Sequence, residues 1–261
     1  MIDAHCHLQD ARFAGDVPAV IARARQAGVR RMLCHGTRPD DWERVSDLAR
    51  TYAEIVPCYG VHPWYAGTLP EDWADNCRAH LVKDHAAVGE IGLDGAIDTV
   101  SPERQEAVFR VQLRLARELG RPFAAHCVKA WDRLIAVLRE EGPFPAGFYV
   151  HAFGGGRDAV RPILDLNGWF SFSAMGVRPE ARRAREALTL IAPERLLAET
   201  DAPDQWTHAC TPACAMDRRN EPAALPAVIA GLARVIGRTP EHMDRQLDDN
   251  AAALWPRLAE A

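Results

Sequence analysis

Two histidines, His5 and His7, stand on either side of a cysteine in the opening stretch IDAHCHL. Residues two apart on a β-strand point to the same side and lie roughly 6.5 Å apart along it. Both imidazole rings can therefore turn toward one metal ion, while Cys6 points the opposite way, toward a helix layer. Asp3 shares the histidines' side and is a candidate to orient their rings. Such a pair is also common as ordinary buried histidine, so a metal site needs further ligands elsewhere.

Other residues of metal-binding type come at the ends of other short apolar runs. They are Glu90 in VGEIGLD, His126 in PFAAHC, His151 in FYVHAFGGG and Asp201 in LLAETDAP. Four imidazoles and two carboxylates suit Zn²⁺ or Mn²⁺, because these ions accept mixed nitrogen and oxygen ligands. A single buried histidine is most often a core residue with its hydrogen bonds satisfied. Six such residues at successive run ends instead predict a site for one or two divalent ions.

The apolar runs have the length and composition of buried strands, and segments with helical periodicity separate them. Residues 101–120 are an example, with Ser101 as N-cap, Pro102 at the first helical position and Gly120 as the stop. The predicted strands are Met1–His5, Arg31–Cys34, Ile55–Tyr59, Ala87–Ile91, Phe123–His126, Phe148–His151, Trp169–Ser173 and Leu196–Glu199.

Strands that alternate with helices pair in parallel, because parallel neighbours need a crossover connection. Eight such units in 261 residues predict a closed (β/α)8 TIM barrel with outer helices, and an open doubly wound sheet is the alternative. The carboxyl ends of barrel strands meet at one face, where enzymes of this fold build their active sites. We therefore expect the six residues to converge at that face. No linker or low-complexity run divides the chain, so residues 1–261 are expected to form a single domain.

The composition is that of an ordinary globular protein, with 48% hydrophobic and 26% charged residues. A net charge of −5 excludes a global basic field that would attract nucleic acid, so such a substrate needs a local patch or a metal. The chain start lacks the pattern of a signal peptide, and no apolar run is long enough for a membrane span. Seven scattered cysteines predict reduced thiols and a cytoplasmic protein. No obligate protein partner is evident, so we expect a monomer or a weak oligomer.

The motifs resemble those of one family, the TatD-type metal-dependent DNases among the amidohydrolase-like hydrolases. The matching motifs appear in the family's order and span nearly the whole chain. They are IDAHCHL, GVHPW, GEIGLD, RQEAVFRVQLRLARELGRPFAAHC, HAFGG, ETDAP and RRNEP. ETDAP or HAF alone would not be specific, whereas the ordered series is.

This resemblance implies a binuclear site and hydrolysis of DNA by an exonuclease that depends on Mg²⁺ or a similar ion. His5, His7 and Asp201 would hold one ion, His126 and His151 the other, and Glu90 would bridge them. His62 and Asp94 match family positions that line the same cleft. Two ions about 3.5–4 Å apart can activate a shared water and clamp a phosphodiester. Asp201 could also accept the proton of that water, while Glu199 is interpreted as structural.

Two positions depart from the family pattern and bear on the substrate. Val128 stands where the family usually has an arginine, and the adjacent Lys129 supplies only a point charge for phosphate. Gly95 replaces an aromatic residue, which could remove a base-stacking platform. Gly154 and Gly155 lie between a strand end and a helix start, where exposed N–H groups favour anions. A simple flexible turn is the alternative there.

The six-ligand set and the motif series make a DNase the leading prediction. A metal-dependent hydrolase of a small amide, ester or phosphoester is the alternative, motivated by Val128, Gly95 and the acidic net charge, and the intact ligand set opposes a third function, a non-catalytic binding protein. Trp64 is either a stacking surface near the cleft or a packed rim residue. Residues 202–222 are expected to form a long loop, in which His208, Cys210 and Cys214 could hold a second zinc ion, although covering the site is the simpler role.

Overall fold

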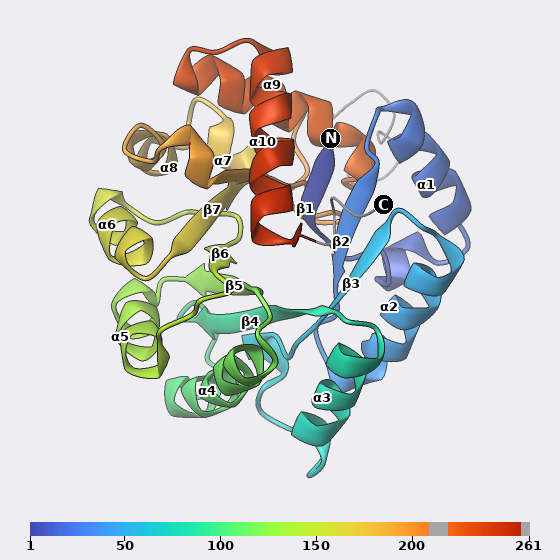
Figure 1. Cartoon of the computed structure of the whole chain (residues 1–261), viewed down its shortest axis with the longest axis vertical. Coiled ribbons are helices and arrows are strands. Elements are labelled where there is room, and N and C mark those ends of the chain that lie inside the picture. Colours follow the sequence, from blue (N-terminus) through green and yellow to red (C-terminus); the bar gives the residue numbers. More distant parts are fainter. Residues whose placement is uncertain (209–218, 257–261) are drawn as a thin grey trace.

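Eight parallel strands form one sheet in the order β1 to β8 in a computed structural model, which describes residues 1–208 and 219–256 (Figure 1). A bridge between Cys6 and Ala202 joins the end of β1 to the segment after β8. Backbone hydrogen bonds from His7 N to Ala202 O (2.7 Å) and from Asp201 N to His5 O (2.9 Å) strengthen this closure. The predicted (β/α)8 barrel is confirmed.

All eight predicted strands are present, most of them within one or two residues of the predicted bounds. They are β1 Ile2–Cys6, β2 Arg31–His35, β3 Ile55–Tyr59, β4 Ala87–Asp94, β5 Phe123–Val128, β6 Phe148–Val150, β7 Gly168–Phe172 and β8 Leu196–Ala198. The α-helices of the described residues are α1 Val17–Gln26, α2 Pro39–Thr51, α3 Trp73–Lys83, α4 Pro102–Leu119, α5 Trp131–Glu141, α6 Arg157–Asp165, α7 Ala174–Val177, α8 Arg182–Leu188, α9 Leu225–Ile236 and α10 Pro240–Leu254.

Helix α4 shows how the local sequence sets these bounds. The Ser101 side chain accepts a hydrogen bond from Arg104 N (3.2 Å), which satisfies one of the free N–H groups of the first turn. Gly120 ends the helix at φ +60°, a conformation that glycine adopts without strain. Between these ends, Phe109 and Leu113 are fully buried against the barrel.

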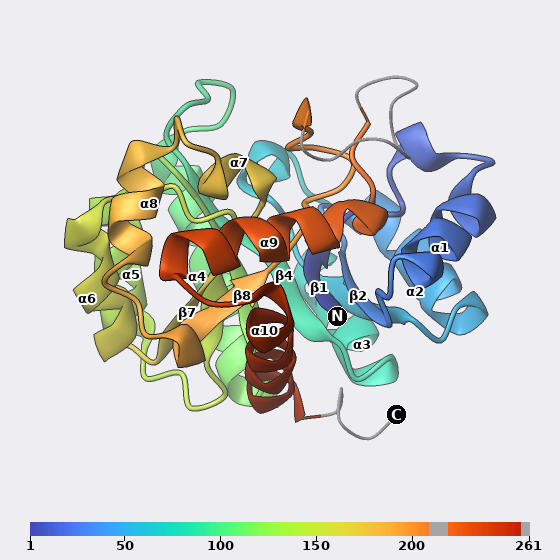
Figure 2. The ribbon, with the colours of Figure 1, turned by 90° about the horizontal axis from the view of Figure 1, so that it is seen from above.

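The core has two parts, one between the strands and the helices and one inside the barrel. The inner part includes Leu33, Ala124 and Tyr149 together with Leu254 and Trp255 from the end of α10. Helices α9 and α10, drawn in red, contact each other and β8 (Figure 2). Apolar side chains thus fill the end of the barrel near α10, and the polar side chains gather toward the carboxyl ends of the strands.

Strand β4 differs most from its predicted bounds, since it continues three residues further, to Asp94. Because the strand continues to Asp94, Glu90 lies within it rather than at its end. The pairing of β4 with β5 shifts register between Val88 and Ile91, the segment that contains Glu90. Gly92 has φ +146°, and a Cβ at this position would overlap the backbone of His126. The close approach of the two strands therefore requires glycine here.

No helix of the described residues is long and apolar enough to cross a membrane. The predicted zinc-binding or covering role of the loop falls mostly on residues 209–218, which include Cys210 and Cys214 and lie outside the described residues.

Candidate metal centre

The six predicted ligands come from five strands and meet at one end of the barrel. Except for His5, which is completely buried, they line one cleft of about 550 Å³. His5 belongs to β1 and His7 follows it, Glu90 belongs to β4 and His126 to β5, His151 follows β6, and Asp201 lies just beyond β8.

Glu90 lies at the centre of the cluster, and its two carboxylate oxygens face different histidine pairs. Oε2 lies 3.2 Å from His5 Nε2 and 3.3 Å from His7 Nε2. Oε1 lies 2.9 Å from His126 Nδ1 and 2.7 Å from His151 Nε2. One carboxylate therefore joins two groups of ligand-type nitrogens.

Asp201 adds a second carboxylate beside the first pair, with Oδ1 3.5 Å from His7 Nε2. Its other oxygen, Oδ2, accepts a hydrogen bond from Gln205 Nε2 (2.9 Å), and Gln205 in turn accepts one from the hydroxyl of Ser173. Asp201 has φ +56°. This value is uncommon for residues other than glycine, but aspartate tolerates it better than most residues do. Side chain and backbone together fix which oxygen faces the histidines.

The tautomer of His5 follows from its contact with Tyr149. The single hydroxyl hydrogen of Tyr149 goes to Ala4 O (2.7 Å), since a carbonyl can only accept. The hydroxyl oxygen must therefore accept from His5 Nδ1 (3.1 Å) and from His35 Nε2 (3.0 Å). His5 thus carries its hydrogen on Nδ1, and its Nε2 lone pair faces Glu90. His35 also stacks on His5, with ring centroids 3.9 Å apart and planes within 5°, which holds the ring in place.

His7 and His126 are oriented in the same way by an acceptor at their outer nitrogen. His7 Nδ1 donates to His35 O (2.8 Å), which leaves its Nε2 lone pair for the cluster. His126 Nε2 lies 3.2 Å from Asp94 Oδ2 and donates to it, which leaves the Nδ1 lone pair facing Glu90. A carbonyl or carboxylate behind a histidine is the usual arrangement behind metal-bound imidazoles.

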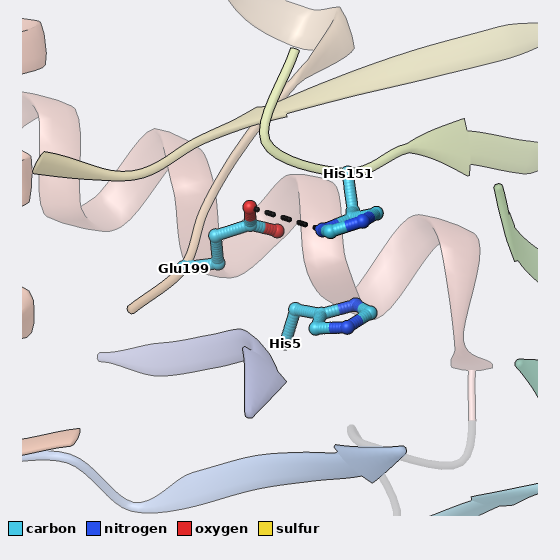
Figure 3. A group of neighbouring side chains, drawn as sticks. All are labelled: His5, His151 and Glu199. Carbon is cyan, nitrogen blue, oxygen red and sulfur yellow. Dashed lines mark ion pairs between the residues drawn. The ribbon is translucent and has the colours of Figure 1, made fainter. Parts of the chain in front are cut away.

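His151 lies between two carboxylates. Its Nε2 faces Glu90, and its Nδ1 lies 3.6 Å from Glu199 Oε1, the pair that Figure 3 draws beside His5. Glu199 is completely buried and is held by hydrogen bonds from Ala152 N (2.6 Å) and from the hydroxyl of Ser171. Glu199 thus lies behind His151, on the side of the ring away from Glu90.

The electrostatic field of the cluster favours positive charge. Burial lowers the pKa of His7, but Asp201 and Glu90 outweigh it and raise that pKa well above its ordinary value. Burial likewise opposes a charge on His151, yet Glu90 and Glu199 raise its pKa well above the usual range. Lone pairs and carboxylate oxygens that face each other at these distances need a proton or a cation between them. A divalent cation meets this requirement, so the donor set fits a metal ion.

Three groups of side chains could each hold an ion, with ligand atoms all within 4.8 Å of one another. They are His5 with His7 and Glu90, His62 with Glu90 and His126, and His5 with His151 and Glu199.

His62 shares the cleft as predicted, but its hydrogen-bond geometry differs from that of the other four histidines. Its Nδ1 accepts from Trp64 N (3.2 Å), so its hydrogen sits on Nε2, 3.4 Å from Glu90 Oε1. Burial lowers the pKa of His62 to about 4, so the ring is neutral. His62 therefore presents a donor to the cleft, whereas the others present lone pairs.

The other predicted substrate contacts lie outside the cleft that His62 lines. Asp94 and Lys129 line a second cavity of about 470 Å³ together with Arg183, so Asp94 does not share the cleft with His62 as expected, although it contacts His126. Gly154 and Gly155 are not among the described residues that line either cavity. A Cβ at Gly155 would lie 2.6 Å from the ring of Phe153, so packing alone requires glycine at this position.

Sequence reasoning missed three residues that orient the cluster: His35, Tyr149 and Gln205. His35 and Tyr149 lie on β2 and β6 within apolar runs, where a buried polar residue gives no sign of its partner. Gln205 lies in the long loop after β8, where no periodicity indicates orientation. One feature of the sequence could have indicated Tyr149. It carries a hydroxyl within an otherwise apolar run, and a buried hydroxyl needs a hydrogen-bond partner.

Comparisons with known proteins agree with the motifs. The family described as TatD related DNase matches residues 2–256. The 3'-5' ssDNA/RNA exonuclease TatD of Pantoea ananatis is 36% identical over 265 residues, which cover 98% of this chain and 99% of the relative. The protein of that name from Edwardsiella piscicida is 36% identical, with 99% and 100% covered. A solved TatD homologue from Escherichia coli K12 superposes with a TM-score of 0.89, 28% identity and 97% of each chain covered.

The match extends over the whole barrel, including every strand end that contributes to the cleft. The resemblance inferred from the motif series is thus confirmed: the chain belongs to the TatD-related DNase family.

Proposed function

We propose that this protein is a divalent-metal-dependent deoxyribonuclease that removes nucleotides from DNA ends by hydrolysing phosphodiester bonds. The observation that carries the proposal is the position of Glu90, whose two oxygens face two separate histidine pairs. Family membership and relatives named as exonucleases support the substrate class. Mg²⁺, Mn²⁺ and Zn²⁺ are all compatible with the mixed imidazole and carboxylate set.

The proposed ligand assignment follows the two groups around Glu90. His5, His7 and Asp201 would hold one ion, His126 and His151 would hold the second, and Glu90 would contribute one carboxylate oxygen to each. The hydrogen-bond acceptors behind His5, His7 and His126 support this assignment, since each leaves an inner lone pair available for an ion, and Glu199 lies 3.6 Å behind His151.

When bound, the two ions lower the pKa of a water and neutralise the charge of the phosphodiester. The hydrogen bond from Gln205 to Oδ2 holds Asp201 with Oδ1 toward the cluster, and the Asp201 carboxylate would accept the proton of the attacking water. His62 offers its Nε2 hydrogen to a phosphoryl oxygen in the same cleft. These groups are held rigidly by backbone and side-chain contacts, so little reorganisation accompanies the reaction.

We assign the remaining predicted contacts as follows. Asp94 acts through His126, whose ring it orients, and Lys129 attracts phosphates that lie beyond the scissile one. Gly154 and Gly155 precede the start of α6. We propose that their N–H groups contact the backbone of the DNA at a point away from the scissile phosphate.

We also propose that the protein acts in the cytoplasm as a monomer or a weak oligomer. The five described cysteines are free and buried, which suits a reducing compartment.

Metal removal should abolish the activity. We expect protein stripped with a chelator to lose at least about a hundredfold of its cleavage of end-labelled single-stranded oligonucleotides, and added Mg²⁺ or Mn²⁺ to restore it. Product ladders on denaturing gels, with the label at either end, measure the rate and the direction together. Undiminished cleavage by stripped protein, with its metal content checked by mass spectrometry, would contradict the proposal.

Hydrolysis of a small amide, ester or phosphoester is the second candidate, favoured by Val128, which is 36% exposed in the cleft. An apolar side chain here suits a compact organic substrate as well as a nucleotide. A panel of small esters, amides and phosphoesters assayed beside the oligonucleotides separates the two functions. Higher kcat/KM for any panel member than for the oligonucleotide would support this second candidate over the first.

Replacing Tyr149 with phenylalanine should weaken metal binding with little change in the shape of the cleft. The variant removes the acceptor of the His5 Nδ1 hydrogen and leaves a buried donor unpaired. Loss of such an outer partner typically reduces metal affinity about 10–100-fold. Calorimetric titration of Mn²⁺ into stripped protein measures the effect, and nitrogen NMR of the imidazoles reports the His5 tautomer.

Tyr59→Phe is the matched control, because this buried hydroxyl donates to Asp84 (2.5 Å), away from the cleft. It should cost stability without changing the affinity for Mn²⁺. Equal metal affinity in Tyr149→Phe and the native protein would show that Tyr149 has no role in holding His5.

A further inference from the structure

Two exposed apolar side chains, Trp64 and Val128, lie at the cleft beside the candidate metal centre. Four large apolar side chains are exposed among the described residues, and only these two line the cleft, with 53% and 36% of their surfaces exposed. Exposed apolar groups that gather at a functional cleft usually contact a ligand there.

Trp64 is fixed in place even though most of its surface is exposed. Its Nε1 hydrogen donates to Asp94 Oδ2 (2.7 Å), and this carboxylate also holds His126. Its ring stands nearly perpendicular to that of His62, with centroids 4.9 Å apart. The polar edge of the indole is therefore anchored to Asp94, which in turn contacts the candidate ligand His126.

Val128 lies on the strand next to Asp94. It is the register partner of Asp94 in the pairing of β4 with β5, at the last position of β5, and its side chain lines the same cleft as Trp64. Trp64 and Val128 are thus both neighbours of Asp94, one through its side chain and one through the backbone pairing. An apolar group of the substrate that lies over Asp94 can contact both.

Apart from Trp64, one other tryptophan or tyrosine lines the cleft among the described residues, and Trp131 lines the second cavity instead. Tyr65 also lines the cleft, but the guanidinium of Arg38 covers its ring at 4.9 Å. A side chain at Gly95 would begin only 2.7 Å from Lys129 O, so the backbone excludes an aromatic residue there. Among these positions, Trp64 alone offers an aromatic surface to a ligand.

We propose that Trp64 and Val128 form a binding subsite for the nucleobase next to the scissile phosphate. The base stacks on the indole of Trp64, and Val128 contacts the same base where an arginine would otherwise reach a phosphate. This inference rests on the proposed nuclease function. Stacking accepts every base because each has a π-face, so the subsite binds bases without reading the sequence.

The test compares Trp64→Ala and Trp64→Phe on two oligonucleotides, one natural and one with an abasic residue at the terminal position. Substrates carrying the abasic residue at either end cover both directions of cleavage. Trp64→Ala should raise KM for the natural oligonucleotide about 10–100-fold. On the abasic oligonucleotide it should change KM less than about twofold, because the base is already absent. Val128→Ala should produce a smaller change in the same direction.

Trp64→Phe separates stacking from the hydrogen bond to Asp94, since it keeps a ring and loses the Nε1 donor. We expect it to remain close to the native protein on both oligonucleotides. If Trp64→Phe and Trp64→Ala lose activity equally on both oligonucleotides, Trp64 acts by orienting Asp94, and the subsite is wrong.

A binding measurement distinguishes failure of the subsite from failure of the nuclease function. Fluorescence anisotropy of a labelled oligonucleotide with metal-stripped protein should show weaker binding for Trp64→Ala and native-like binding for Trp64→Phe. Unchanged binding in Trp64→Ala overturns the subsite, even when the native enzyme cleaves DNA. Absence of cleavage by metal-loaded native protein overturns the nuclease function instead.

Discussion

Replacing Glu90 with glutamine is expected to reduce oligonucleotide hydrolysis by more than about 10³-fold, because the bridging charge of the metal centre is lost. The two oxygens of Glu90 face two histidine pairs at 2.7–3.3 Å. An amide presents N–H hydrogens to one pair, where a lone pair is needed. One proposed ion therefore loses its Glu90 ligand, and the other keeps only a neutral amide oxygen, from a single substitution of nearly unchanged volume.

Initial rates on a labelled oligonucleotide and Mn²⁺ binding to the same preparations measure this effect. Glu141→Gln is a matched control, because Glu141 is also a buried glutamate but pairs with Arg110 and Arg114, away from the cleft. It should lower the thermal stability and leave the rate per folded molecule unchanged. A Glu90→Gln enzyme with more than a tenth of the native rate would contradict the bridging role.

Asp201→Asn is expected to lower kcat about 10²–10⁴-fold, the usual contribution of a general base. Asparagine keeps the shape of the side chain and an oxygen for the cluster, but it cannot accept the proton of the attacking water. KM should change little, since the substitution removes no contact with the DNA. The kcat effect should therefore exceed the effect on metal affinity, which separates proton transfer from simple loss of a ligand.

Single-turnover rates at saturating Mn²⁺ measure the chemical step for this variant. Asp84→Asn serves as its control, since Asp84 accepts hydrogen bonds from Ser46 and Tyr59 and takes no part in the cleft. An Asp201→Asn protein that cleaves at the native rate once loaded with metal would exclude Asp201 as the proton acceptor.

The convergence of the six candidate ligands could be predicted from the sequence because barrel topology does most of the positioning. Five of the eight apolar runs end close to one of the six candidate ligands, and parallel closure brings those ends to one face. His5 and His7 illustrate this, since spacing along one strand already indicates a shared direction. The family motifs added the proposed division into two groups around Glu90.

The extent of β4 could not be predicted in the same way. Gly92 interrupts the apolar pattern directly after the predicted end at Ile91, whereas the structure uses Gly89 and Gly92 for close contacts with β2 and β5. Glycine is depleted in strands on average, so its role in strand packing is visible only once the neighbour is known.

The contacts by which His35 and Tyr149 orient His5 could not be predicted from the sequence either, for a different reason. His35 and Tyr149 are 114 residues apart, and their contact at 3.0 Å depends on the register of strands β2 and β6 across the barrel. Composition places both side chains in the core, but only the folded barrel identifies their partner as His5.

Titration of Mn²⁺ into metal-stripped protein, with nuclease activity recorded in the same samples, tests the central claim most directly. Two ions should bind per chain, and cleavage of single-stranded DNA should rise as the sites fill. Glu90→Gln should remove both the tight binding and the activity. Full activity without bound metal, or tight two-ion binding in Glu90→Gln, would contradict a metal-dependent nuclease that Glu90 organises.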